Sequence, residues 1–244
     1  MPTTFDMSYC GPPPLPDDLW LRWNLDPLVT AALLLGLGLL WLRPLSERER
    51  WSGTAALATL AVIFISPLCA LTVALFSARV VHHVLLVAVA APLLAWAMRG
   101  RAAHLAALLT PLAILHTALF WLWHAPDAYG WALGSTPVYW LMQLTLFGSA
   151  TALWMSLFTA SSARAIAALL LLTAQMGLLG ALLVFSGRPL YVPHFATTIP
   201  FGLDPLSDQQ LAGLIMWVPA SLPYLAAALL RLLGVLRHAE GQRA

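Results

Sequence analysis

The sequence has few charged residues and no lysine. Only 9% of its 244 residues are charged and 61% are hydrophobic, whereas a soluble domain carries roughly a quarter charged residues. So few charges cannot cover a water-facing surface, which excludes a soluble domain and predicts an integral membrane protein with several spans. The net charge of +2 gives no reason to expect binding to nucleic acid.

The sequence also lacks the motifs of common enzyme classes. No P-loop, nucleophile elbow or paired carboxylates are present, so we expect neither phosphoryl transfer nor hydrolysis, and no catalytic residues. The first twenty residues show no basic segment followed by an apolar one, so we expect no cleavable signal peptide. Two cysteines, Cys10 and Cys69, do not make a disulfide framework, and the sequence leaves open whether they pair.

Apolar runs bounded by charged residues, proline and glycine are what the sequence does contain. They predict seven transmembrane helices, at roughly 27–42, 51–68, 80–98, 103–123, 137–158, 165–186 and 208–232. All must be helical, because an open sheet edge cannot satisfy its backbone in lipid. We therefore expect an all-α bundle over residues 27–232, a Pro-rich extracytoplasmic arm over 1–26 and a cytoplasmic tail over 233–244.

The arginines predict the orientation of this bundle. Nine of the twelve follow the first, third, fifth and seventh predicted helices, and only Arg22, Arg79 and Arg188 lie on the opposite side. All seven aspartates also lie on that opposite side. Because positive charge favours the cytoplasmic side, the N-terminus is predicted outside and the C-terminus inside.

Five of the seven histidines fall in the outer half of this predicted bundle. An imidazole in a membrane is costly unless it is hydrogen-bonded, charged and paired, or bound to metal. Thioether sulfur is available at similar depth, and imidazole with sulfur suits copper, especially Cu(I). Each histidine taken singly can also be structural. The candidate metal ligands are His82, His83, His116, His124, His194, Met142 and Met216.

Three further polar residues are candidates for supporting roles. Arg79 and His83 are four residues apart and share one face of a helix. His82 is about 100° away from His83 around that helix, so we expect only one of the two, His83, to face the bundle centre. Asp208 lies where it can cap the last helix, and Gln209 is expected to join helices or line a cavity.

Several motifs in a fixed order resemble a known family. They are Ser66-Pro-Leu68, a His-bearing helix ending in Ala91-Pro-Leu93, Trp123-His-Ala-Pro126, Gly187-Arg-Pro-Leu-Tyr191 and Asp208-Gln-Gln-Leu-Ala-Gly-Leu-Ile-Met-Trp217. Together they resemble the multi-spanning CtaG family of cytochrome c oxidase assembly factors, which is distinct from the single-span copper chaperone of the same name. The resemblance covers roughly residues 27–232 and implies a bacterial inner-membrane protein that helps to mature a heme–copper oxidase. Oxidase subunits, a periplasmic copper donor and the lipid bilayer are the implied partners, and copper is the implied metal.

The sequence departs from this family's pattern at two places. Arg79 stands where the family tends to have the first of two histidines one turn apart, and Met142-Gln143 stands where it often has a histidine. His82 and Met142 are possible replacements. A metal-free scaffold for oxidase subunits, a bis-His haem protein and a transporter remain alternatives, although few intramembrane charges argue against an ion-coupled transporter.

Overall fold

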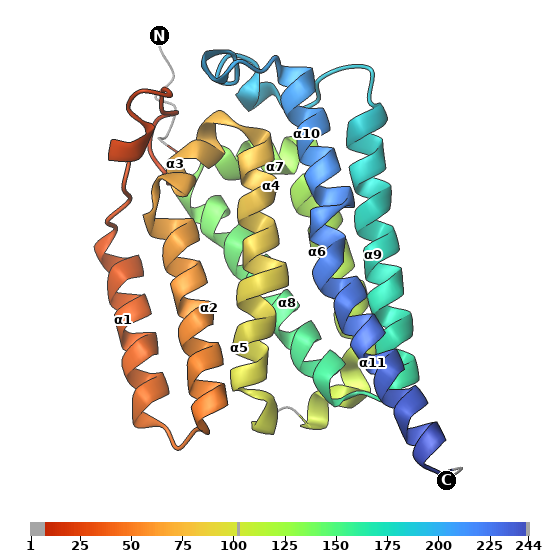
Figure 1. Cartoon of the computed structure of the whole chain (residues 1–244). Coiled ribbons are helices and arrows are strands. Elements are labelled where there is room, and N and C mark those ends of the chain that lie inside the picture. The colour runs from red at the N-terminus through yellow and green to blue at the C-terminus, as the bar shows by residue number, and fades with distance from the viewer. Residues whose placement is uncertain (1–7, 102, 243–244) are drawn as a thin grey trace.

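The computed structural model describes residues 8–101 and 103–242, and this part of the chain is helical without strands. Figure 1 shows the arrangement, with the two termini at opposite ends of the bundle. The α-helices are α1 (Pro27–Leu42), α2 (Glu47–Ile65), α3 (Pro67–Ala74), α4 (Phe76–Val84), α5 (Ala91–Ala97), α6 (Leu109–His124), α7 (Pro126–Leu133), α8 (Thr136–Thr159), α9 (Ser162–Phe185), α10 (Pro205–Trp217) and α11 (Leu222–Gly241). A π-helical segment, Leu85–Ala90, joins α4 to α5. Short 3-10 helices lie at Leu19–Leu21, Arg99–Arg101, Ala103–Leu108, Val192–His194, Ile199–Phe201 and Pro219–Ser221.

Five helical stretches are long and apolar enough to cross a membrane. They are Phe76–Ala97, His104–His124, Thr136–Thr159, Ser162–Phe185 and Pro205–Glu240. The pair α2 and α3, bent by 51° at Ser66, makes a sixth if it counts as one span. The apolar α1 has 16 residues, or about 24 Å of helix, against a hydrocarbon core of about 30 Å. The protein is therefore an all-helical membrane protein with five to six candidate spans, and a seventh span stays a prediction.

Several observed helix boundaries differ from the approximate predicted ones, and proline accounts for much of the difference. The helix predicted over 51–68 ends at Ile65, because Pro67 begins a new helix in another direction. Pro126 likewise begins α7, a short helix that is absent from the seven predicted ones. The helix predicted over 208–232 is interrupted by a 3-10 turn at Pro219–Ser221 and continues to Gly241.

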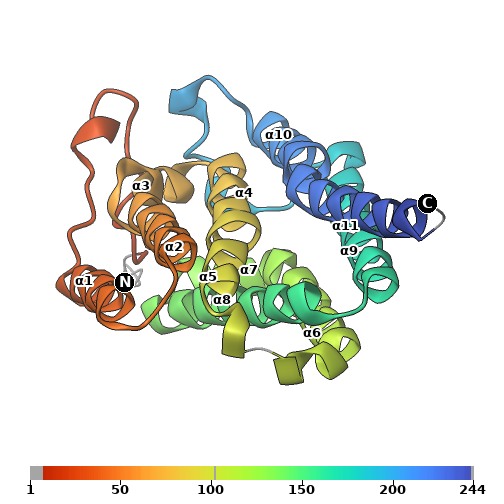
Figure 2. The same cartoon turned by 60° about the horizontal axis from the view of Figure 1, so that its bottom comes forward.

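The third predicted span is central to the bundle. Its helix begins at Phe76, four residues before the predicted start, so His82 and His83 lie on its second turn. In both views this span lies between α2 and α10, while α5 also packs on α8 (Figure 2). Side chains on α4 are consequently surrounded by protein.

The arm that precedes α1 is fixed to the end of the bundle that carries α3. A disulfide joins Cys10 to Cys69 of α3, with a Cα–Cα distance of 5.4 Å. The Asn24 side chain also donates to the Phe64 carbonyl at 3.2 Å. The pairing that the sequence left open is thus present, and it holds the arm over α3.

Candidate functional site

Helix α4 carries the polar residues at the centre of the candidate site. Arg79, His82 and His83 follow the i, i+3, i+4 spacing of one helix face. Their side chains are enclosed, with exposed fractions of 0%, 0% and 4%. The expectation that only one of the two histidines faces the interior was wrong, since α2 covers the flank of α4 on which His82 lies. The His82 ring packs edge-on against Phe64 of α2, with centroids 5.1 Å apart.

His83 and His124 bring α4 and α6 together. Their ring centroids are 5.7 Å apart, and those of His82 and His83 are 5.8 Å apart. The Nδ1 atom of His124 lies 2.7 Å from the Phe120 carbonyl oxygen. Because a carbonyl only accepts, Nδ1 must carry the proton. This leaves the Nε2 lone pair of His124 available, and a backbone bond of this kind is how metal-binding histidines are usually oriented.

Several buried side chains on α4 and α8 have unpaired polar atoms. All three side-chain nitrogens of Arg79, both ring nitrogens of His82 and His83, and both amide atoms of Gln143 are buried without a hydrogen-bond partner in the described part of the chain. Buried polar groups in proteins are nearly always paired, and each exception needs an explanation. Such a group without a partner costs about 1–3 kcal/mol, and more if it is charged. The cluster is therefore expected to hold something besides protein.

Two tyrosines lie beside Arg79. The Arg79 guanidinium carbon is 5.3 Å from the centre of the Tyr139 ring. Burial raises the pKa of Tyr129, and the charge of Arg79 opposes this shift, so the two side chains are near neighbours. Neither tyrosine was predicted. An aromatic hydroxyl within an apolar helix was the available signal, because a buried tyrosine hydroxyl usually has a partner.

His194 is close to this cluster but has its own partners. Its Nδ1 lies 3.2 Å from the Ala74 carbonyl oxygen, so Nδ1 carries the proton and Nε2 accepts from the Tyr129 hydroxyl at 2.7 Å. Burial lowers the pKa of His194 to about 4; the Ala74 carbonyl opposes this shift, while the Arg79 charge adds to it. His194 is thus a neutral link between the loop before α10, helix α7 and the end of α3.

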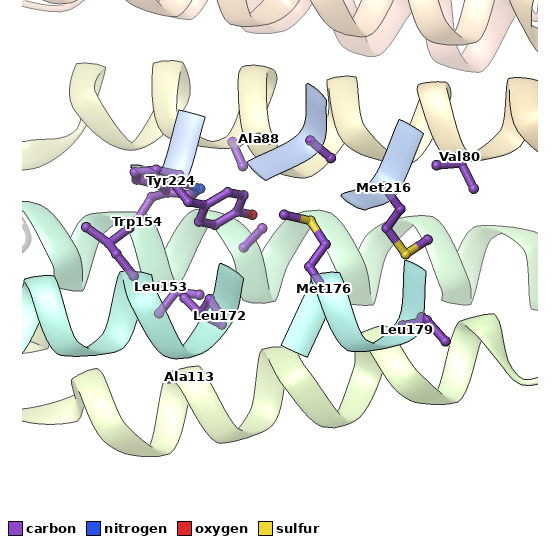
Figure 3. Packing of buried hydrophobic residues seen from close by; sticks show 14 of the residues in the cluster. Val80, Ala88, Ala113, Leu153, Trp154, Leu172, Met176, Leu179, Met216 and Tyr224 are labelled. Carbon is purple, nitrogen blue, oxygen red and sulfur yellow. The ribbon is translucent and has the colours of Figure 1, made fainter. Parts of the chain in front are cut away.

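The remaining predicted ligands lie in other surroundings. His116 Nδ1 is 2.8 Å from the Ser149 hydroxyl on α8. Met216 belongs to the apolar core formed with Met176, Trp154 and Tyr224, as Figure 3 shows. Met142 is fully buried in a second apolar cluster, which also contains both cysteines and Tyr139. Among the described residues no three His, Cys, Asp or Glu side chains are placed to hold one metal ion. Of the predicted ligands on different helices, His83 and His124 are the pair whose rings come into contact.

Asp208 does not cap its own helix, contrary to expectation. Asp204 caps α10 by accepting from the backbone of Leu206 and Ser207. Asp208 instead accepts from the N–H groups of Phe76 and Ser77, at 2.7 and 3.2 Å, and from the Ser77 hydroxyl at 2.5 Å. A carboxylate bound to the first N–H groups of a helix, here those of α4, interacts favourably with the dipole of that helix. Asp208 therefore fixes the start of α4, and with it the position of the histidines.

Gln209 joins the same end of α10 to the loop that follows α9. Its carbonyl oxygen accepts from the Leu190 N–H at 2.7 Å, and its amide donates to the carbonyls of Leu183 and Arg188 at 3.3 and 3.4 Å. The expectation that Gln209 joins helices is met in this form. Neighbouring residues of α10 thus hold α4 on one side and the His194-bearing loop on the other.

Comparison with known proteins gives a result at the level of families. Residues 43–238 match the family model described as cytochrome c oxidase caa3 assembly factor. No curated protein and no solved structure matches the chain. The matched segment contains the α4 cluster, His124, His194 and both polar residues at the start of α10.

Proposed function

Because the chain belongs to the cytochrome c oxidase caa3 assembly factor family, we propose that it assists the assembly of a heme–copper oxidase by handing copper to the catalytic subunit. The contact between His83 and His124, with ring centroids 5.7 Å apart, carries this proposal. Neutral imidazole is a good copper ligand. The pair is enclosed by protein, which protects Cu(I) from water and oxidation.

The residues around this pair fit copper in part. His82 has two unpaired ring nitrogens and can complete a three-histidine set after a rotamer change. The fully buried Met142 can supply a soft sulfur ligand. The charge of Arg79 acts on His83 and opposes a second cation there. Copper would therefore be held weakly, which suits a protein that must release it.

We also propose seven spans, with the N-terminus in the periplasm and the C-terminus in the cytoplasm of a bacterial inner membrane. The arginine bias supports this orientation. The Cys10–Cys69 disulfide also supports this orientation. It lies at the end of the bundle away from the C-terminus, and disulfides persist in oxidising compartments such as the periplasm. Alkaline phosphatase fused after Gly241 should be inactive, and an active fusion would reverse the orientation.

Oxidase maturation in a deletion strain tests the copper proposal. We expect oxidase subunits to be made but to lack copper, with low activity that excess copper partly restores by mass action. His83→Ala and His124→Ala should behave like the deletion. His238→Ala is the matched control, because His238 is exposed near the C-terminus and bonds only the carbonyl one turn before it.

A metal-free scaffold for oxidase subunits is the second candidate function. The observation that favours it is the uncompensated charge of Arg79 beside His83. It predicts that His83→Ala and His124→Ala leave the copper content and activity of the oxidase unchanged. A Soret band in the purified protein would instead favour a bis-His haem protein.

A further inference from the structure

Arg79 is a permanently charged side chain that forms no ion pair in the described part of the chain. It is 0% exposed, and none of its three side-chain nitrogens has a hydrogen-bond partner. The ion pairs found within residues 8–101 and 103–242 involve other arginines, Arg22 with Asp18 and Arg99 with Glu49. The nearby Asp208 is occupied by the backbone and hydroxyl groups at the start of α4.

This arrangement is unfavourable for an empty site. A guanidinium stays protonated in proteins, so it cannot escape burial by losing a proton. An unpaired buried charge costs several kcal/mol. The hydroxyls of Tyr129 and Tyr139 interact with Arg79, and the Tyr139 ring, 5.3 Å away, adds an attraction of about 0.5–2 kcal/mol, but these neutral groups supply no counter-charge.

The groups around Arg79 define what can fill the site. The Gln143 amide and one nitrogen each of His82 and His83 can donate hydrogen bonds, while the Gln143 oxygen and the other imidazole nitrogens need a donor. The rings of His82, His83 and His124 stand edge to face with centroids 5.7–5.8 Å apart and are in contact, so a bound group must be small and lie beside the rings. The missing group is therefore small, anionic and rich in oxygen, and a protonated oxygen or bound water would serve the acceptors.

We propose that Arg79, His82, His83 and Gln143 form a binding site for a small oxyanion of the carboxylate class. The planar fork of arginine matches two carboxylate oxygens in parallel hydrogen bonds. Gln143 lies one turn after Tyr139 on α8, so its amide is expected on the side of that helix where Tyr139 meets Arg79. Hydrogencarbonate, a free carboxylate or the acidic side chain of a partner shares this chemistry. The proposal requires neither copper nor a role in oxidase assembly.

Anion-dependent unfolding of the purified full-length chain in detergent tests the proposal. Sodium hydrogencarbonate, formate and acetate are titrated against sodium chloride at constant pH and ionic strength. We expect a saturable rise in the unfolding temperature, since a ligand that binds only the folded state stabilises it. Saturation by hydrogencarbonate alone assigns a free anion. Saturation by acetate as well assigns a site that accepts an acidic side chain.

Variants connect the response to the site. Arg79→Gln should abolish the rise, and Arg79→Lys should weaken the apparent affinity at least tenfold, because lysine lacks the fork. Gln143→Leu should weaken the affinity while Arg79 remains. Arg188→Gln is the matched control, since Arg188 is an exposed arginine near the same end of the bundle, and it should keep the full response.

Two results would overturn the proposal. The first is a native chain that responds to hydrogencarbonate, formate and acetate no more than to chloride. The second is an undiminished response in both Arg79→Gln and Gln143→Leu. Since copper is absent from every arm, failure of the copper proposal leaves these results unaffected.

Discussion

The crossing of α9 and α10 depends on two glycines, and enlarging one of them should destabilise the protein. A Cβ atom on Gly213 would lie 2.6 Å from the carbonyl oxygen of Gly180 and 2.8 Å from a methyl carbon of Val184. A Cβ atom on Gly180 would in turn lie 2.8 Å from the carbonyl oxygen of Gly213. Because the nearest obstructing atom at each glycine is a backbone oxygen, rotation of a side chain cannot relieve the contact, and the helices must separate.

The size of the effect follows from two opposing contributions. Overpacking in a close-packed interior costs about 1–3 kcal/mol. Replacing glycine by alanine within a helix returns roughly 0.5–1 kcal/mol. Gly213→Ala should therefore lower the free energy of unfolding by about 1–2 kcal/mol. For a chain of this length that corresponds to roughly 2–8 °C in unfolding temperature.

Thermal unfolding in detergent, followed by circular dichroism, measures this change. Gly148→Ala in α8 is the matched control, because a Cβ atom there meets no other atom within 4 Å. That variant should be equal to the native protein or more stable by up to about 1 kcal/mol. If Gly213→Ala is as stable as Gly148→Ala, the close approach of α9 and α10 is not a constraint on this fold.

Three further predictions concern the end of the bundle that carries α3 and the start of α10. Asp208→Asn should lower the free energy of unfolding by about 1–3 kcal/mol, because the start of α4 loses a charged acceptor. Unfolding by urea or SDS measures this change, with Asp127→Asn at an exposed site as the control. The double variant Cys10→Ser, Cys69→Ser should lose about 4 kcal/mol, from a cross-link that spans 59 residues, and its unfolding temperature should not respond to dithiothreitol. Since the folded-state pKa of His194 is about 4 and its ordinary value is 6.5, the unfolded chain binds more protons between these values. Stability should then fall by about 3 kcal/mol as the pH drops from 6.5 to 4, and His194→Gln should flatten the measured dependence of unfolding temperature on pH.

The helical class and the approximate positions of the long helices could be predicted from the sequence. Hydropathy reports the cost of leaving backbone unpaired in lipid, and this cost depends on local composition alone. The boundaries were less accurate, because they depend on distant residues. The start of α4 at Phe76 is fixed by Asp208, which lies 132 positions further along the chain, and no local pattern contains this contact.

The candidate site could also be predicted only in part, because its contacts join residues that are far apart in the sequence. A one-sided excess of histidines predicted a site at one end of the bundle, and the rings of His83 and His124 lie close together in the structure. The sequence could not show that His194 uses both ring nitrogens on Tyr129 and Ala74, since the three residues lie in three separate segments. Tyr139 and the burial of His82 also depend on how α2 and α8 pack against α4.

The π-helical segment Leu85–Ala90 has a consequence for comparisons among related chains. A π turn holds one more residue than the α turn that it replaces, so the span from Phe76 to Ala97 contains an inserted residue relative to a continuous α-helix. A homologue with a regular helix here should align with this chain only across a one-residue gap between Leu85 and Ala90. An ungapped alignment would shift one end of the span by about 100° around the helix axis, and would match Arg79, His82 and His83 to residues that face a different neighbour.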